Sequence, residues 1–348
     1  MERTYLYLVM SLLLVGCKTK EASVVEKAVN EESINDSVFV VAFGSCDKQD
    51  ETNPFWDDVL AETPDVWIWG GDNIYADTDD MELMQSMYAK QKQDPNYKKL
   101  SKTVPIVGTW DDHDYGLNDG GEEFVMKSQS QQLFLDFLDV PANDSRRKQN
   151  GVYAAHDFKT PSGNIKVLVL DTRYFRSQLE KDENPNRRYK INRDDAATIL
   201  GQEQWQWLRK ELDSSQAKFN LIVTSIQFLS WEHGFESWGN FPKEVEKLKR
   251  VIVESGAEGV MVLSGDRHIS EFSKTKLPSL SYPLVDFTSS GLTHSYSSYT
   301  FEPNDYRVGE VVPVPSFGLI YLDLAQKEVH FKIMGENGKI YQELKQSY

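Results

Sequence analysis

The sequence predicts an α/β domain, and three features of the chain support this class. Short runs rich in Val, Ile, Leu and Trp recur along the chain, and their nearly continuous apolar character indicates strands covered on both faces. Stretches with apolar residues at helical spacing lie between several of these runs. A hairpin signal and a C-terminal series of strand patterns add antiparallel pieces.

Six apolar runs are predicted to form the central strands, and four amphipathic stretches are predicted to form helices. We expect the strands at residues 38–46, 65–75, 104–114, 165–173, 219–227 and 259–268. We expect the helices at residues 53–63, 122–140, 201–215 and 242–256. Residues 152–171 read as a hairpin that turns at Pro161, Ser162 and Gly163, and residues 317–344 as a meander at a sheet edge.

Polar side chains follow each of the six predicted central strands. The segments are Gly44–Asp47, Gly71–Tyr75, Asp111–Asp114, Asp171–Arg173, Ser225–Gln227 with Trp231–His233 shortly after, and Gly265–His268. In layered α/β folds, ligands bind outside the carboxyl ends of the strands. The sequence therefore predicts that these segments meet at one shared site.

The residue types in these segments are those of a metal site. The candidates are Cys46, Asp72, Tyr75, Asp111, Asp112, His113, Asp266 and His268, with Gln227 and His233 as further candidates for the metal or the rim. Thiolate and phenolate favour ferric or zinc-like ions, whereas carboxylates favour calcium, magnesium or manganese. Two metals can stabilise both oxygens of an in-line displacement and lower the pKa of a bound water toward about 7. This chemistry suits the hydrolysis of phosphate esters.

The motifs GSC, GDNIY, GTWDDHD, LDTR, HGFESWGNFP and GDRH occur in this order within the region from about residue 38 to 345. As an ordered set they resemble the alkaline phosphatase D, or PhoD-like, metallophosphoesterases. The resemblance implies a four-layer αββα sandwich with two mixed β-sheets. It also implies a site that holds iron (Fe³⁺) together with calcium, and it does not exclude zinc, manganese or magnesium.

Carried over block by block, the resemblance implies a ligand set. Cys46 would bind iron through its thiolate and Tyr75 through its phenolate, while Asp72 would bridge two metals. Asp112 occupies the position of a ligand to the second metal. Asp111 would cap or orient this segment.

The last motif and two further residues complete the expected machinery. Asp266 and His268 stand in the family's last metal-binding block, and as residues i and i+2 of one strand end their side chains should point the same way. His113 would lie beside the substrate as an acid or an orienting donor. Arg173 is expected to clamp phosphate, because its planar fork fits two non-bridging oxygens.

The chain departs from the family pattern at two places. Many relatives carry a β-sandwich domain before the catalytic domain, whereas here we expect only a short tether before Val38. The fifth strand end offers Gln227 where the wider superfamily has His. A metal there would be held by the amide oxygen of Gln227, by His233, or by neither.

The N-terminus is predicted to direct the protein out of the cytoplasm. Residues 1–16 combine Arg3 with an apolar run too short for a bilayer span of roughly 20 residues, which is typical of a signal peptide. The segment LVGC resembles a bacterial lipobox, which implies lipidation of Cys17. We expect residues 17–37 to be a flexible tether and residues 38–345 the PhoD-like domain. The alternative is an ordinary signal peptide.

These features define the expected function and its alternatives. We expect hydrolysis of phosphate monoesters, diesters or both by a metal-bound hydroxide, in a membrane-anchored lipoprotein facing the periplasm or the cell surface. One alternative is a phospholipid phosphodiesterase of phospholipase D type, because a membrane tether raises the local concentration of lipid. Another is a non-catalytic lipoprotein that binds metal or phosphate. A net charge of −16 without a basic cluster excludes a charge-driven nucleic-acid partner, and no protein partner is indicated.

Overall fold

The computed structural model describes Met1 and residues 37–348. Apart from Met1 and Ser37, the predicted signal peptide (1–16), the lipidation site Cys17 and the predicted tether (17–37) lie outside the described residues. These three features stay predictions. Within the described part, no helix has both the length and the apolar character needed to cross a bilayer.

The first sheet has a parallel half and an antiparallel half. Its strand order is β15-β14-β13-β1-β2-β3. The parallel half consists of β1 (Val38–Gly44), β2 (Val66–Gly70) and β3 (Ile106–Thr109). The antiparallel half is the predicted C-terminal meander, which forms one edge through β13 (Phe317–Asp323), β14 (Glu328–Met334) and β15 (Ile340–Ser347).

The second sheet is also mixed, with the order β12-β10-β11-β9-β8-β5-β4. Its parallel centre contains β5 (Gly163–Val169), β8 (Phe219–Val223), β9 (Val260–Ser264) and β11 (Leu284–Ser289). Its antiparallel edges are β4 (Ala154–Thr160), which forms the predicted hairpin with β5, and β10 (Ser270–Thr275) with β12 (Arg307–Val312). A separate small ribbon joins β6 (Glu180–Lys181) to β7 (Tyr189–Lys190).

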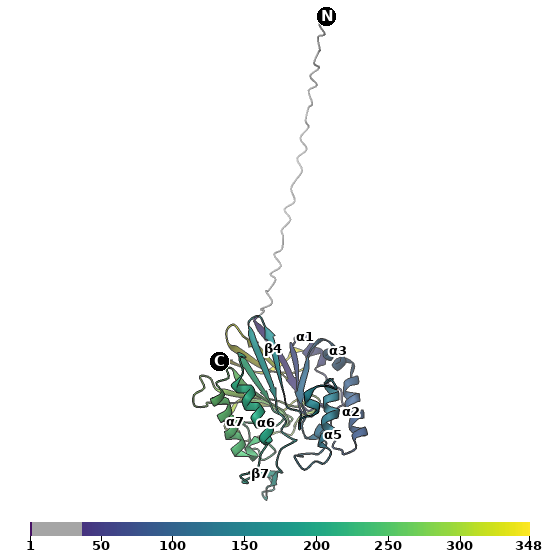
Figure 1. Ribbon diagram of the computed structural model, residues 1–348, viewed down its shortest axis with the longest axis vertical. Helices are drawn as coiled ribbons and strands as arrows, with labels where there is room; N and C mark the ends of the chain where they lie inside the picture. Colours follow the sequence, from purple (N-terminus) through teal and green to yellow (C-terminus); the bar gives the residue numbers. More distant parts are fainter. Residues whose placement is uncertain (2–36) are drawn as a thin grey trace. The chain divides into compact units, whose positions relative to one another are not determined.

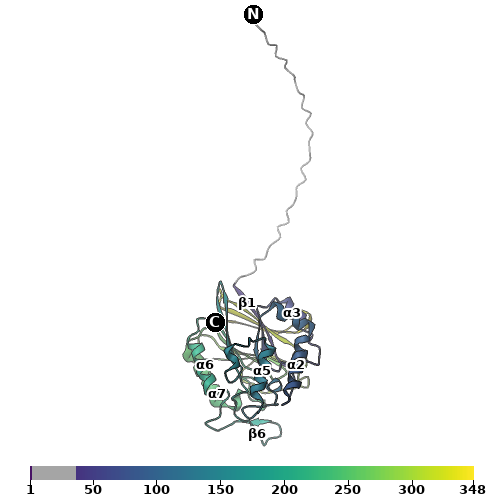
Figure 2. The same ribbon diagram turned by 45° about the vertical axis from the view of Figure 1, so that its right-hand side comes forward.

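Helices cover the outer face of each sheet, which makes four layers (Figures 1 and 2). The first sheet is covered by α1 (Trp56–Ala61), α2 (Met81–Gln93), α3 (Pro95–Thr103) and α5 (Lys127–Phe137). The second is covered by α6 (Gly201–Asp213) and α7 (Pro242–Ser255). A third apolar cluster lies between the sheets and includes Val41, Ile68, Val167 and Leu221. The predicted αββα sandwich with two mixed sheets is confirmed.

In the described part of the chain, four short helices lie in the loops between the longer elements. They are α4 (Asp112–Tyr115) and the 3₁₀ helices η1 (Ser145–Arg147), η2 (Trp238–Asn240) and η3 (Glu336–Gly338). Helices α2 and α3 were not predicted, because their apolar residues are sparse. Their caps are nevertheless visible in the sequence: Asp80 accepts hydrogen bonds from two backbone N–H groups of α2, and Asp94 does the same for α3.

The predicted central strands end earlier than expected. β2 ends at Gly70 and β3 at Thr109, so the polar residues that follow belong to loops rather than to strand ends. Apolar content marks where a strand is buried, but it does not mark where its ladder of hydrogen bonds ends. The polar segments after β2 and β3 are therefore not bound to the ladder of the sheet, and they can turn toward the second sheet.

The two sheets meet at the carboxyl ends of these strands. The Thr109 hydroxyl donates to the Leu170 carbonyl at 2.7 Å and links β3 of the first sheet to β5 of the second. A Cβ atom on Gly265 would lie 2.6 Å from Ser45 Oγ and 2.7 Å from the Gly70 carbonyl oxygen. Only glycine allows the loop after β9 to approach so closely. The Gly265 N–H also donates to the Ser225 carbonyl after β8 at 3.0 Å, so three predicted strand ends from each sheet reach one region.

Trp56 is the centre of the aromatic packing under α1. It is buried, and its ring lies 5.0 Å from Trp67, 5.7 Å from Trp69 and 5.4 Å from Tyr97 between ring centroids. We expect Trp56→Ala to lower the free energy of unfolding by about 3–5 kcal/mol, because it removes these contacts and leaves a cavity. Chemical denaturation measures this loss. Leu83→Ala on the exposed face of α2 is the control, and an equal loss in both variants would contradict the prediction.

Candidate metal centre

Unusual backbone geometry turns the predicted ligands inward. Cys46, Asp72, Asp266 and His268 have φ values of 60°, 52°, 68° and 54°, in the left-handed region that non-glycine residues rarely adopt. Each such residue costs about 1–2 kcal/mol, so the surrounding contacts must hold it in place. The expectation that Asp266 and His268 belong to one strand end is wrong. Both lie in the turn between β9 and β10, where alternation along a strand does not apply.

Three overlapping groups of side chains offer ligand atoms within 4.8 Å of one another. The groups are Cys46, Asp72 and His268; Asp72, Asp112 and His113; and Asp111, Asp112 and Asp266. Asp72 belongs to the first two groups and Asp112 to the last two. The structure therefore brings together these predicted ligands, with Asp72 in a place where it can bridge. His268 belongs to the first group and Asp266 to the last, at opposite ends of this series.

One end of the series contains the softer ligands. Asp72 Oδ2 lies 3.4 Å from the Cys46 Sγ and 3.4 Å from the Tyr75 hydroxyl. The Tyr75 hydroxyl in turn lies 3.1 Å from His268 Nε2. Burial raises the pKa of the Cys46 thiol to about 12 and the pKa of Tyr75 well above its usual range. Burial also lowers the pKa of His268 to about 4. These atoms converge on a position that suits a cation, because a bound metal would favour thiolate and phenolate.

The other end contains hard oxygen ligands. Asp111 and Asp112 are buried and Asp266 is partly buried, and loss of solvent raises the pKa of Asp111 to about 7 and that of Asp266 well above its usual range. Burial also opposes ionisation of Asp112, but Arg173, His113 and hydrogen bonds from Asn118 (2.6 Å) and the Asp119 N–H (2.7 Å) lower its pKa. Asp111 Oδ2 and Asp112 Oδ1 are buried without a hydrogen-bond partner. Unpartnered carboxylate oxygens in such a place fit a divalent cation.

Arg173 lies beneath the site rather than on its surface. Its side chain is fully buried, with Nη2 2.5 Å from Asp111 Oδ1 and Nη1 2.7 Å from Glu236 Oε2. Arg176 approaches the other oxygen of Glu236 at 3.0 Å. Arg173 is absent from the residues that line the pocket described next. Its contacts are those of a residue that balances buried carboxylates, and its predicted role as a phosphate clamp stays a prediction.

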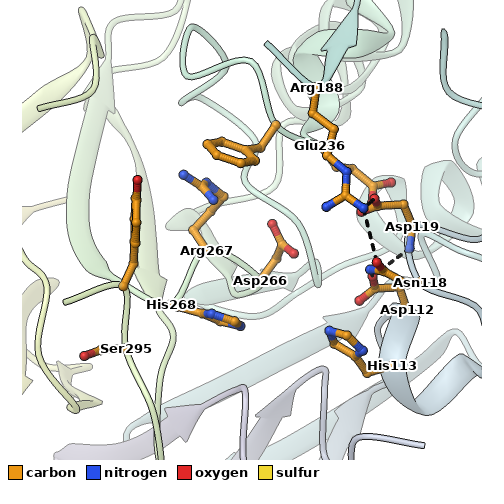
Figure 3. Close-up of a pocket in the computed structure, with 12 residues that line it drawn as sticks. Asp112, His113, Asn118, Asp119, Arg188, Glu236, Asp266, Arg267, His268 and Ser295 are labelled. Atoms are coloured by element: carbon orange, nitrogen blue, oxygen red, sulfur yellow. Dashed lines mark hydrogen bonds and ion pairs between the residues drawn. The ribbon is translucent and has the colours of Figure 1, made fainter. Parts of the chain in front are cut away.

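A pocket of about 340 Å³ opens above the ligand groups (Figure 3). Asp112, His113, Asp266 and His268 line it together with Asn118, Asp119, Arg188, Phe235, Glu236, Arg267, Ser295 and Tyr296. Arg267 stacks on Phe235 at 4.3 Å and pairs with Glu302 at 2.7 Å, and Arg188 pairs with Asp119 at 2.5 Å. Neither arginine was predicted. Arg267 stands inside the GDRH motif, whereas no pattern marks Arg188.

The remaining candidates take other partners. The Gln227 amide donates to Glu271 and Thr288, both at 2.9 Å, and His233 Nδ1 accepts from the Phe235 N–H at 3.1 Å. Gln227 Oε1 and His233 Nε2 are buried without a hydrogen-bond partner, and His233 does not belong to the three ligand groups found in the described part of the chain. His294 was not a predicted site residue, yet its ring lies 4.4 Å from that of His268 and 5.0 Å from that of Tyr75.

The fold and the site together define a class of two-sheet α/β proteins with metal-binding groups at the carboxyl ends of their strands. The chain belongs to the PhoD-like phosphatase family, whose sequence profile matches residues 39–312. The predicted family is therefore confirmed. Over 203 residues the chain is 27% identical to alkaline phosphatase D of Bacillus subtilis (strain 168). This match covers 53% of the chain and 35% of that protein, so it spans about a third of the relative's length.

Solved structures share the fold. The structure of PhoD matches with a TM-score of 0.68 and 20% identity, over 89% of this chain and 68% of that chain. A dimetal phosphatase from Danio rerio matches with a TM-score of 0.50 and 13% identity, over 89% of this chain and 99% of the other. GAP50, the anchor in the inner membrane complex of Plasmodium, matches with a TM-score of 0.55 and 11% identity, over 89% of each chain.

Metal binding to this centre should weaken in acid. Asp111, Asp266 and the Cys46 thiol have pKa values raised by burial, so a cation can bind only as their protons leave. Affinity should therefore fall as the pH drops from about 8 to about 6, with net proton release on binding. Calorimetry of the chelator-treated protein in buffers of different ionisation enthalpy measures both effects. An affinity that does not change with pH would contradict this prediction.

Proposed function

We propose that this protein is a metal-dependent hydrolase of phosphate esters. The observation that carries the proposal is the series of three overlapping ligand groups at a pocket whose wall contains two arginines. Membership of the PhoD-like phosphatase family supports it, as do the names of its relatives, alkaline phosphatase D and dimetal phosphatase. A phosphate-ester small molecule is the proposed substrate.

The chain's own residues have distinct roles in this proposal. Cys46, Asp72, Tyr75, Asp112, Asp266 and His268 would hold the metals, which when bound would supply Lewis acidity and lower the pKa of water. Arg188 and Arg267 face the pocket and provide positive charge for the phosphoryl oxygens. The positive charge of Arg173 balances the carboxylates of Asp111 and Asp112, whose Oδ1 atoms lie 2.5 Å and 4.0 Å from Arg173 Nη2.

We propose iron for the softer end of the series and calcium for the harder end. Thiol, phenol and imidazole groups lie around the first position, and that donor set suits a ferric ion. Asp111, Asp112 and Asp266 offer oxygens alone, which suits calcium. Zinc, manganese or magnesium at either position would be found by elemental analysis of protein purified without added metal.

A phospholipid is the second candidate substrate, and the exposed rim of the pocket favours it. Tyr296 lines the pocket with 36% of its surface exposed, and Phe301 in the same loop is 74% exposed. These rings can contact apolar chains of an amphiphilic ester. We also propose that the protein is a lipoprotein anchored through Cys17 on the extracytoplasmic side of a bacterial membrane, where phospholipid is abundant.

The function is tested with purified protein and four substrate classes. We expect aryl phosphate monoesters, aryl phosphate diesters or both to be hydrolysed, with activity lost on chelation and restored by metal. The third class is a soluble alkyl phosphate ester, and the fourth is phospholipid in mixed micelles. Faster hydrolysis of the phospholipid than of the soluble esters would support phospholipid as the substrate. Asp72→Asn, which removes the shared carboxylate, should lower kcat by at least about 100-fold. Tight binding of phosphate without turnover would instead indicate a non-catalytic binding protein.

The proposed iron position has a spectroscopic consequence. Thiolate and phenolate bound to ferric iron give visible charge-transfer bands, so the purified protein should be coloured. Tyr75→Phe removes the hydroxyl that lies 3.1 Å from His268 Nε2 and should shift or bleach the band. Tyr296→Phe is the matched control, because this tyrosine lines the pocket outside the ligand groups. An unchanged spectrum in Tyr75→Phe would remove Tyr75 from the ligand set.

A further inference from the structure

We propose that Asp77 is the positioning residue that fixes His113 as the proton donor to the leaving group. The inference rests on the proposed function and adds a residue that no motif singled out. It is carried by the contacts between the loop after β2 and the first residues of α4. These contacts hold the His113 ring and its backbone at the same time.

Asp77 contacts His113 at two points. Its carboxylate Oδ2 lies 2.7 Å from His113 Nδ1, and its backbone N–H donates to the His113 carbonyl at 3.2 Å. The Ala76 N–H donates to the same carbonyl at 3.2 Å, and the Tyr75 ring packs 4.2 Å from the imidazole with an interplanar angle of 32°. The His113 N–H donates to Asp72 Oδ1 at 3.3 Å. Asp77 and Tyr75 therefore contact the ring of His113, and Ala76 and Asp77 hold its backbone.

The backbone of Asp77 is shaped for this contact. Its φ is 44°, a left-handed conformation that only Gly, Asn and Asp adopt at low cost. The side chain is 44% exposed, so apolar packing does not explain its conformation. The contact to His113 does explain it, because the turn brings both the N–H and the carboxylate of Asp77 to the same residue. The Asp114 carboxylate accepts hydrogen bonds from the backbone N–H groups of Asp72 and Asn73.

The orientation leaves one ring nitrogen for chemistry. With Nδ1 held by Asp77, Nε2 of His113 remains for the pocket, where Figure 3 shows the ring beside Asp112 and Asp266. His268 differs, because its Nε2 contacts the Tyr75 hydroxyl. Among the pocket histidines, His113 is the one with a carboxylate on Nδ1, the arrangement that fixes a ring for proton transfer at Nε2.

The step balances without a further reactant. Water adds its oxygen to phosphorus and releases a proton to solvent. The bond from phosphorus to the leaving oxygen breaks, its electron pair stays on that oxygen, and the oxygen takes the proton from Nε2. The imidazolium becomes a neutral ring that keeps its Nδ1–H on Asp77, and solvent returns the proton afterwards. Alkoxide leaving groups need this proton, whereas p-nitrophenolate leaves readily without it.

The test is therefore a comparison of leaving groups. We prepare Asp77→Asn, which keeps the shape and removes the charge, and Asp77→Gly, which accepts the left-handed backbone and removes the carboxylate. We expect kcat for an alkyl phosphate to fall by about 100-fold, and kcat for p-nitrophenyl phosphate to change by less than about threefold. Asp79→Asn, which neutralises an exposed carboxylate two residues along, is the control and should change neither. Equal losses on both substrates would overturn the inference.

A second measurement does not depend on turnover. In chelator-treated protein labelled with ¹⁵N-histidine, the ring signals of His113 are assigned by their absence in His113→Gln. Asp77→Gly should shift these signals while Asp79→Asn leaves them unchanged, and unshifted signals would overturn the Asp77–His113 contact. Inactivity of the unaltered protein on every ester would overturn the proposed function and the proton-transfer part of this inference. Activity without a leaving-group effect would overturn the inference alone.

Discussion

Burial of several carboxylates at one point is the constraint on which the rest of this structure depends. Asp72, Asp111, Asp112 and Glu236 are each buried where the two sheets meet, and Asp266 lies beside Asp111 and Asp112 at the wall of the pocket. Carboxylates held so close cannot all ionise without positive charge among them. Arg173 and Arg176 provide part of that charge from below, through Asp111 and Glu236. Asp111 Oδ2 and Asp112 Oδ1 have no hydrogen-bond partner, and both residues belong to a group of side chains that could hold a cation.

The two-sheet architecture explains how this cluster forms. The segments after β1, β2 and β3 of the first sheet supply Cys46, Asp72 and Asp112, the last as the first residue of α4, and loops after β5 and β9 of the second supply Arg173 and Asp266. Neither sheet by itself supplies all of these site residues. The junction at Thr109 and Gly265 brings the loops together, so the chemistry depends on the packing of the sheets as well as on the residues themselves.

Much of the site could be predicted because its motifs follow strands. Cys46, Asp72, Asp112 and His268 each lie within a few residues of an apolar run, and parallel strands bring such positions to one edge. Asp77, Arg188 and Arg267 were missed for physical reasons. Asp77 acts through a left-handed turn, Arg188 precedes a two-residue strand in a polar loop, and Arg267 faces the pocket only because the turn after β9 twists.

The sequence by itself determined the class of fold, the segments that form the central strands, the family and the kinds of ligand that would gather, because hydrophobic pattern and motif spacing are local properties. Only the tertiary structure decided the finer arrangement. It placed Asp266 and His268 in different ligand groups, left Gln227 and His233 with other partners, and enclosed Arg173 between Asp111 and Glu236. The reason is that loop conformation and the approach of two sheets depend on contacts between residues far apart in the chain, which no local pattern records.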